Sequence, residues 1–84
     1  MNKEQALRII ANEQLKNYNM GEERYHRENE VGICREKGLW KVYATDERAS
    51  IVTGSESVFT NENAAWDNFI ERLRADKVLD EYYR

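Results

Sequence analysis

The spacing of apolar residues predicts a helix at the start of the chain. Leu7 and Ile10 recur at a helical interval with polar residues around them, which is typical of an amphipathic helix. Asn2 followed by Gln5 is the pattern of a capped helix start, in which a side chain accepts hydrogen bonds from free backbone amides. We therefore expect a helix over residues 3–17.

Strand-like alternation occupies residues 31–44. A turn at residues 36–38, where a glycine can adopt a positive φ, divides this stretch into the two arms of a β-hairpin. Residues 51–53 predict a third strand, which could extend to Val58. The stretch before the hairpin lacks a clear period, and it leaves open a short fourth edge strand within residues 22–28.

A second, longer helix closes the pattern. Thr60 or Asn61 is placed to cap its start, and Glu62 puts a negative charge in its first turn, where the helix dipole favours it. Five apolar residues then recur at helical spacing and are expected in the core: Ala65, Trp66, Phe69, Ile70 and Leu73. Beyond Arg74 apolar and acidic residues are mixed, so we expect this end of the helix to pack loosely or against another molecule.

These elements predict one α+β domain that spans residues 1–84. The order is α-β-β-β-α, with an antiparallel three-stranded sheet, room for the short fourth edge strand, and two helices packed on one face. The other face is expected to stay open and partly aromatic, because either Trp40 or Tyr43 points outward from the hairpin.

Composition and charge narrow the classes of function. The 84 residues include 35% charged side chains, carry a net charge of −3 and have a mean hydropathy of −0.92. No cluster of Lys and Arg offers contacts to a phosphate backbone, so nucleic acid is not an expected ligand. A basic protein partner is compatible with this charge. No apolar run is long enough for a membrane span or a secretion signal, so we expect a cytoplasmic protein.

The residues that usually carry chemistry are scarce. His26 is the only histidine and is expected on an exposed loop, while Cys34, the only cysteine, is expected to be a small buried side chain in a strand. The sequence has no ligand spacing for a metal, no glycine-rich phosphate loop and no nucleophile motif. It therefore predicts a protein without cofactor, metal or catalytic residues, and not an enzyme.

Three groups of residues are candidate contacts with a protein partner. Residues 46–48 directly follow the hairpin, and we interpret them first as a turn and second as a contact. The acidic stretch over residues 22–30 is either a solvated loop or an acidic rim that faces a basic partner. The two tyrosines near the C-terminus fit a contact surface, self-association as a homodimer, or packing on the sheet edge. The candidates are Glu22, Glu23, Glu28, Glu30, Asp46, Glu47, Arg48, Tyr82 and Tyr83.

Three stretches of the chain resemble a known family. They are NKEQALRII in the first helix, EKGLWKVYATDERAS across the hairpin, and VFTNENAAWDNFIERLRADK at the last helix. Together they resemble the immunity protein 59 family of bacterial polymorphic toxin systems. The resemblance implies a small cytoplasmic protein that binds and neutralises a cognate toxin domain. It carries over no catalytic or contact residues.

Two other hypotheses stay open from the sequence. A small adaptor or regulatory protein with another partner fits the same composition. The element order is also that of double-stranded-RNA-binding domains, which contact RNA phosphates through a basic helix start. Here the last helix begins with Asn61-Glu62-Asn63-Ala64 and has no lysine there, so this hypothesis is disfavoured.

Overall fold

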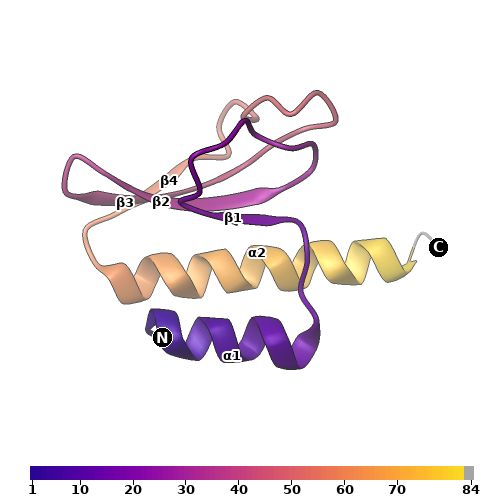
Figure 1. Cartoon of the computed structure of the whole chain (residues 1–84), viewed down its shortest axis with the longest axis horizontal. Helices are drawn as coiled ribbons and strands as arrows, with labels where there is room; N and C mark the ends of the chain where they lie inside the picture. The colour runs from indigo at the N-terminus through magenta and orange to yellow at the C-terminus, as the bar shows by residue number, and fades with distance from the viewer. Residues whose placement is uncertain (83–84) are drawn as a thin grey trace.

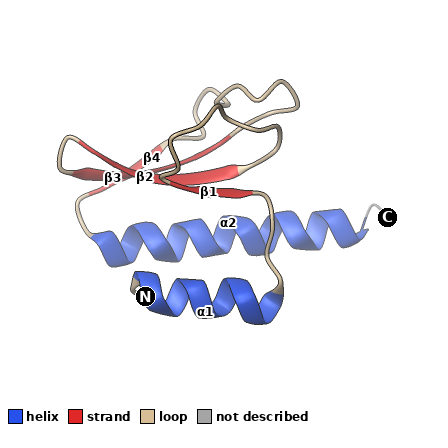
Figure 2. Cartoon of the chain, viewed as in Figure 1, coloured by secondary structure: helices blue, strands red, loops and turns tan. Residues whose placement is uncertain are grey.

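The computed structural model describes residues 1–82, and residues 83–84 lie outside the described part. Two helices and a four-stranded sheet make up the fold (Figure 1). In chain order they are α1 (Lys3–Glu13), β1 (Tyr18–Met20), β2 (Val31–Glu36), β3 (Leu39–Ala44), β4 (Ser57–Phe59) and α2 (Glu62–Tyr82). Both helices lie on the same side of the sheet (Figure 2), so the predicted α+β class is confirmed.

α1 starts as predicted and ends earlier. The Gln5 amide donates to the Asn2 side chain at 2.8 Å, and the Asn2 amide donates to Gln5 Oε1 at 2.9 Å, which completes the capping box. Gln14 then adopts a left-handed conformation with φ 55, and its amide bonds back into the last turn. The helix therefore stops short of residue 17.

The predicted hairpin is confirmed. β2 and β3 pair antiparallel along their whole length, and Lys37 and Gly38 form the turn with φ of 52 and 78. β4 extends the sheet beyond β3, and β1 adds to the other edge of β2. The resulting strand order is β1-β2-β3-β4.

The fourth strand is present, but at another place in the sequence. It is β1, which follows α1 closely and pairs with β2 in parallel, whereas residues 22–28 form no strand. Gly21, at φ 75, turns the chain out of the sheet after β1. A strand of three residues shows too little alternation to stand out in the sequence, which is why the pattern placed the edge strand too late.

The third strand includes Val58, the far end of the stretch predicted for it, but not residues 51–53. Ile51 makes a single isolated bridge to Thr45, and the chain then turns at Gly54, where φ is 83. Only after this turn does β4 pair with β3. The prediction of a strand over residues 51–53 was therefore wrong, because these β-branched residues lie in a loop.

α2 lies against the sheet and carries much of the core (Figure 1). Trp66 and Phe69 are buried as predicted, at 2% and 0% exposed. The Trp66 ring contacts Trp40 of β3 with 6.1 Å between centroids, and Phe69 meets Tyr18 of β1 edge-on at 6.3 Å. α1 packs on α2, and its Ile10 belongs to the same hydrophobic cluster.

The last turns of α2 extend past the sheet (Figure 1). Val78, Leu79 and Tyr82 are 64%, 54% and 78% exposed there. At 100° per residue they lie on the side of the helix opposite to the core stripe that ends at Leu73. The expectation of loose packing at this end is confirmed as far as residue 82. Among the described residues, neither helix has the length and apolar composition needed to cross a membrane.

The sheet face away from the helices is partly covered. Tyr43 points to that face and is only 5% exposed, because it lies over Gly32 and against the ring of His26. Trp40 points the other way, toward α2. The prediction of an open aromatic face was wrong at this position, since loops close over that side of the sheet (Figure 2).

Candidate partner-binding surface

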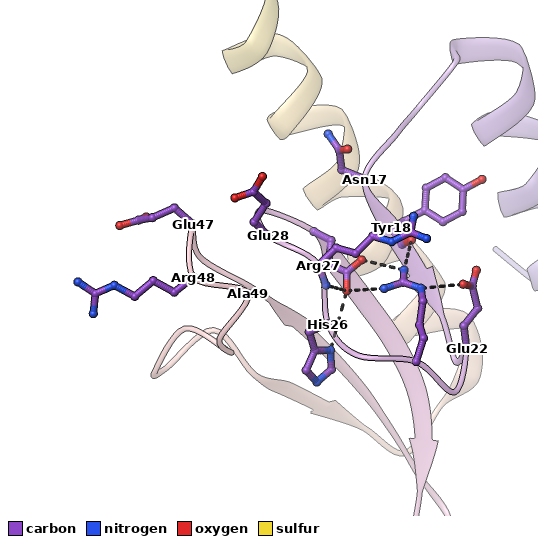
Figure 3. Close-up of a pocket in the computed structure, with 11 residues that line it drawn as sticks. Asn17, Tyr18, Glu22, His26, Arg27, Glu28, Glu47, Arg48 and Ala49 are labelled. Atoms are coloured by element: carbon purple, nitrogen blue, oxygen red, sulfur yellow. Dashed lines mark hydrogen bonds and ion pairs between the residues drawn. The ribbon is translucent and has the colours of Figure 1, made fainter.

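Two loops lie together on the sheet face away from the helices, and we call residues 21–30 and 45–56 the loop end (Figure 1). The Asn29 amide in the first loop donates a hydrogen bond to the Asp46 carbonyl in the second at 3.0 Å. An open cleft of about 820 Å³ lies at this end. It is lined by Asn17, Tyr18, Glu22, Arg24, His26, Arg27, Glu28, Glu30, Glu47, Arg48 and Ala49 (Figure 3).

Arg24 is the centre of a hydrogen-bond network in the cleft. Its Nε donates to Glu22 Oε2 at 2.9 Å. Nη1 donates to the Tyr25 carbonyl at 3.1 Å and to Glu30 Oε1 at 3.3 Å, and Nη2 donates to the Tyr18 carbonyl at 3.3 Å and to Glu30 Oε2 at 2.9 Å. The hydrogen bonds to Glu30 and Glu22 raise the pKa of Arg24. Because a guanidinium has five N–H groups, all donors of this side chain are used to fasten the first loop onto β1.

Glu30 is buried, although the sequence predicted it on either a solvated loop or an acidic rim. Its side chain is 1% exposed. Besides Arg24, its carboxylate accepts a hydrogen bond from the Arg27 amide at 3.0 Å, and its own amide donates to Thr45 Oγ1 at 2.8 Å. Burial raises the pKa of this carboxyl, but the bonds from Arg24 and Arg27 and the Arg24 charge outweigh it and hold the pKa below its usual range. Glu30 therefore joins the two loops from inside, and its interpretation as a surface contact was wrong.

Asp46 shapes the turn that follows β3, as predicted. Its Oδ1 accepts hydrogen bonds from the Arg48 amide at 2.8 Å and the Ser50 amide at 3.1 Å. These bonds hold the pKa of the Asp46 carboxyl below its usual range. Ala49 closes the turn at φ 61, in the left-handed region. Asp46 is thus engaged within the turn, while Glu47 and Arg48 are exposed.

Several charged side chains of the loop end are free to meet a partner. Figure 3 shows Glu47, Arg48 and Glu28 extending away from the rest of the cleft, and no hydrogen bond or ion pair holds these side chains within residues 1–82. Glu23 is exposed on the same loop. The loop end contains seven acidic and three basic residues, a net charge of −4, whereas the whole chain carries −3. The loop end therefore carries more net negative charge than the rest of the chain taken together.

The structure brings two of the three predicted groups together. The predicted residues that line the cleft are Glu22, Glu28, Glu30, Glu47 and Arg48. Tyr82 lies instead on the projecting end of α2, and Tyr83 lies outside the described residues. Sequence reasoning missed Arg24 and Arg27. The alternation of arginine with glutamate over residues 22–30 was the available signal, because mixed charges in a loop can pair internally.

His26 lies on an exposed loop as expected, whereas Cys34 is less buried than expected. The His26 side chain is 39% exposed, and its ring lies edge-on to Tyr43 with 5.3 Å between centroids. Cys34 is half-buried and free, and burial raises the pKa of its thiol, which keeps it protonated and poorly nucleophilic. Within residues 1–82, no three His, Cys, Asp or Glu side chains are grouped as metal ligands.

Comparisons of the chain with known protein families, curated proteins and solved structures find no match. Function is therefore inferred from the molecule's own surface and from the three sequence stretches described above. At the loop end, free charges and a cleft coincide.

Proposed function

We propose that this protein is a non-enzymatic, cytoplasmic binding protein that neutralises a cognate bacterial toxin domain through its loop end. The observation that carries the proposal is a set of free charged side chains on a backbone that is fixed from within. Within residues 1–82, the side chains of Glu28, Glu47 and Arg48 make no hydrogen bond or ion pair. The ion pair of Arg24 with the buried Glu30 holds the first loop. The resemblance of the three sequence stretches points to the same class of protein.

A fixed loop favours tight binding. A side chain that must be immobilised when a complex forms costs about 0.5–1.5 kcal/mol, and flexible loops cost more. Here Arg24 uses all its donors, and Glu30 ties the first loop to Thr45 of the second. The backbone of the loop end therefore needs little reorganisation on binding, and more of the contact energy contributes to affinity.

The charge of the loop end favours a basic partner. Its net charge is −4, so the rest of the chain carries +1. A domain that acts on nucleic acid needs a basic surface to contact phosphates. Complementary charges accelerate the encounter of two proteins and help to exclude wrong partners. We therefore expect the partner to be a toxin domain with a basic surface, such as a nuclease.

The state of the cleft favours binding over catalysis. A general base needs a lone pair within hydrogen-bond reach of a substrate proton. The carboxylates of Glu22 and Glu30 are both engaged by Arg24. The carboxylate of Asp46 is engaged by backbone amides of its own turn. These groups support the loops, and the free charges lie on flanking, exposed positions.

The proposal is tested by a growth-rescue experiment. The domain encoded immediately upstream of this chain is expressed in a bacterial host, alone and together with the chain. We expect the domain to stop growth and the chain to restore it. A charge-reversed variant, Glu47→Lys with Arg48→Glu, should rescue less well because it disturbs the loop end.

The matched control reverses a pair on the other side of the molecule. Glu4 and Arg8 form an exposed ion pair on α1 at 2.7 Å. Glu4→Lys with Arg8→Glu keeps the net charge and should rescue as well as the wild type. A domain that is harmless alone, or that kills equally in the presence of the chain, contradicts the proposed function.

A further inference from the structure

Tyr25 is held in an unusual position for a tyrosine. Its side chain is 97% exposed, more than any other large apolar side chain of residues 1–82, and Tyr82 follows at 78%. Aromatic side chains normally bury a large part of their ring, because that burial dominates core and interface energies. A tyrosine left wholly in water is therefore a candidate for burial in a complex, where tyrosine is among the residues that contribute most to binding energy.

The backbone on both sides of Tyr25 is fixed. On one side the Arg24 amide donates to the Glu22 carbonyl at 3.0 Å, and Arg24 Nη1 donates to the Tyr25 carbonyl itself at 3.1 Å. On the other side the Arg27 amide donates to the buried carboxylate of Glu30 at 3.0 Å. The ring thus projects from a rigid base, and only its own two side-chain torsions lose freedom on binding.

The charges beside Tyr25 indicate what surface the ring would meet. Glu23 and Glu28 are exposed on the same loop, and neither has a hydrogen bond or ion pair within the described chain. An aromatic ring on a loop with two free carboxylates complements an apolar pocket with a basic rim. A pocket with an acidic rim would place like charges together and oppose the contact.

We propose that Tyr25 is the aromatic anchor of the loop end, and that its ring enters an apolar pocket on the basic surface of the partner protein. The inference rests on the proposed function, since the partner is the toxin domain proposed above. It goes further by naming the residue that supplies most of the binding energy. It also names the chemistry of the pocket that receives it.

The test is isothermal titration of the purified upstream-encoded domain with four forms of the chain. These are wild type, Tyr25→Ala, Tyr25→Phe and Tyr82→Ala. We expect Tyr25→Ala to raise Kd at least about 30-fold, as loss of an interface hot spot does. Tyr25→Phe keeps the ring and should stay within about fivefold, and Tyr82→Ala, a matched exposed tyrosine, should stay within about threefold. The Tm of Tyr25→Ala should equal that of the wild type, because the side chain is exposed.

A second arm tests the basic rim. The association rate is measured at low and high salt for Glu23→Lys and for Glu71→Lys, a control on the exposed side of α2. We expect Glu23→Lys to slow association roughly three- to tenfold at low salt, with little effect of Glu71→Lys. Equal association rates for the wild type and Glu23→Lys would contradict the proposal that the pocket has a basic rim.

The outcomes separate this inference from the proposed function. If wild type binds and Tyr25→Ala binds equally well, the anchor is overturned and the proposed function stands. If Tyr82→Ala weakens binding and Tyr25→Ala does not, the contact lies at the end of α2 and the anchor is again overturned. If wild type does not bind the domain, both the proposed function and the anchor fail.

Discussion

At the scale of single residues, Gly32 decides how the second face of the sheet is covered. Gly32 and Tyr43 are cross-strand partners, and a Cβ on Gly32 would lie 2.0–2.4 Å from atoms of the Tyr43 ring. No side chain other than hydrogen fits there. The ring can therefore lie flat against the strand, and the His26 ring of the first loop then packs on it. One glycine thus helps to seat the loop that presents the free charges.

We predict that Gly32→Ala lowers the free energy of unfolding by about 1–3 kcal/mol, as overpacking of a filled site does. The measurement is urea unfolding, and the same substitution is repeated in a Tyr43→Ala background. There the clash is absent, so the added cost should shrink to a few tenths of a kcal/mol. Wild-type stability of the single variant would show that the ring does not depend on Gly32.

The ion pair of Arg24 with the buried Glu30 predicts how stability responds to pH. The folded pKa of Glu30 lies below its usual range: burial raises it, and the bonds from Arg24 and Arg27 outweigh that effect. The contribution of such a carboxyl is present above its unfolded pKa, about 4.3, and is lost as pH falls through the folded pKa. The wild type should therefore lose stability below about pH 4.5.

We predict that Glu30→Gln is less stable than the wild type at pH 7 by about 2–4 kcal/mol, because Arg24 then loses its buried charge partner and keeps only the exposed Glu22. The difference in stability between Glu30→Gln and the wild type should narrow as pH is lowered, because the carboxyl of Glu30 in the wild type becomes neutral as well. Tm is followed from pH 7 to pH 3. The control is Glu23→Gln, at an exposed position, which should match the wild type at pH 7. Parallel curves for Glu30→Gln and the wild type would contradict the role given to this pair.

At the scale of elements, neighbouring residues in the turn after β3 have different roles. Asp46 accepts two backbone hydrogen bonds within the turn, whereas Glu47 makes none in the described chain. We predict that Asp46→Ala lowers the Tm, because the turn loses two hydrogen bonds, and that Glu47→Ala leaves the Tm nearly unchanged. Thermal unfolding of the two variants checks this. A greater fall in Tm for Glu47→Ala would mean that the free charges of the turn are structural.

Elements with a strong period were the ones that the sequence could predict. The hairpin alternates over both arms, and the stripe from Ala65 to Leu73 repeats at helical spacing, so both were placed correctly. β1 and β4 were not, because three residues carry almost no period and pairing depends on the strand beside them. Ile51 and Val52 looked like a strand, but Gly54 and the turn before β4 put them in a loop.

Only part of the candidate site could be predicted from the sequence, because the rest depends on contacts that form as the chain folds. The acidic character of both loops follows from the sequence alone, and so does the turn at Asp46. The pairing of Arg24 with Glu30 does not, because it depends on how the first loop folds back on β1 and on Thr45. Glu30 therefore looked like its exposed neighbours until the chain closed around it.

At the scale of the whole molecule, the charge is unevenly distributed. The loop end carries −4 and the remainder +1, and the start of α2 has no lysine. Contacts to phosphates need clustered Lys and Arg side chains, and the start of α2 does not provide them. We predict that a gel-shift assay with duplex RNA shows no retardation at low salt. A retardation that weakens as salt rises would restore the RNA-binding hypothesis.

Amide hydrogen exchange shows whether a preformed acidic loop end covers a basic toxin domain. Exchange is compared in the chain alone and with the upstream-encoded domain added in excess. We expect new protection over residues 21–30 and 45–50 and little change over residues 75–82. Protection confined to the end of α2, or no change anywhere, would contradict this expectation.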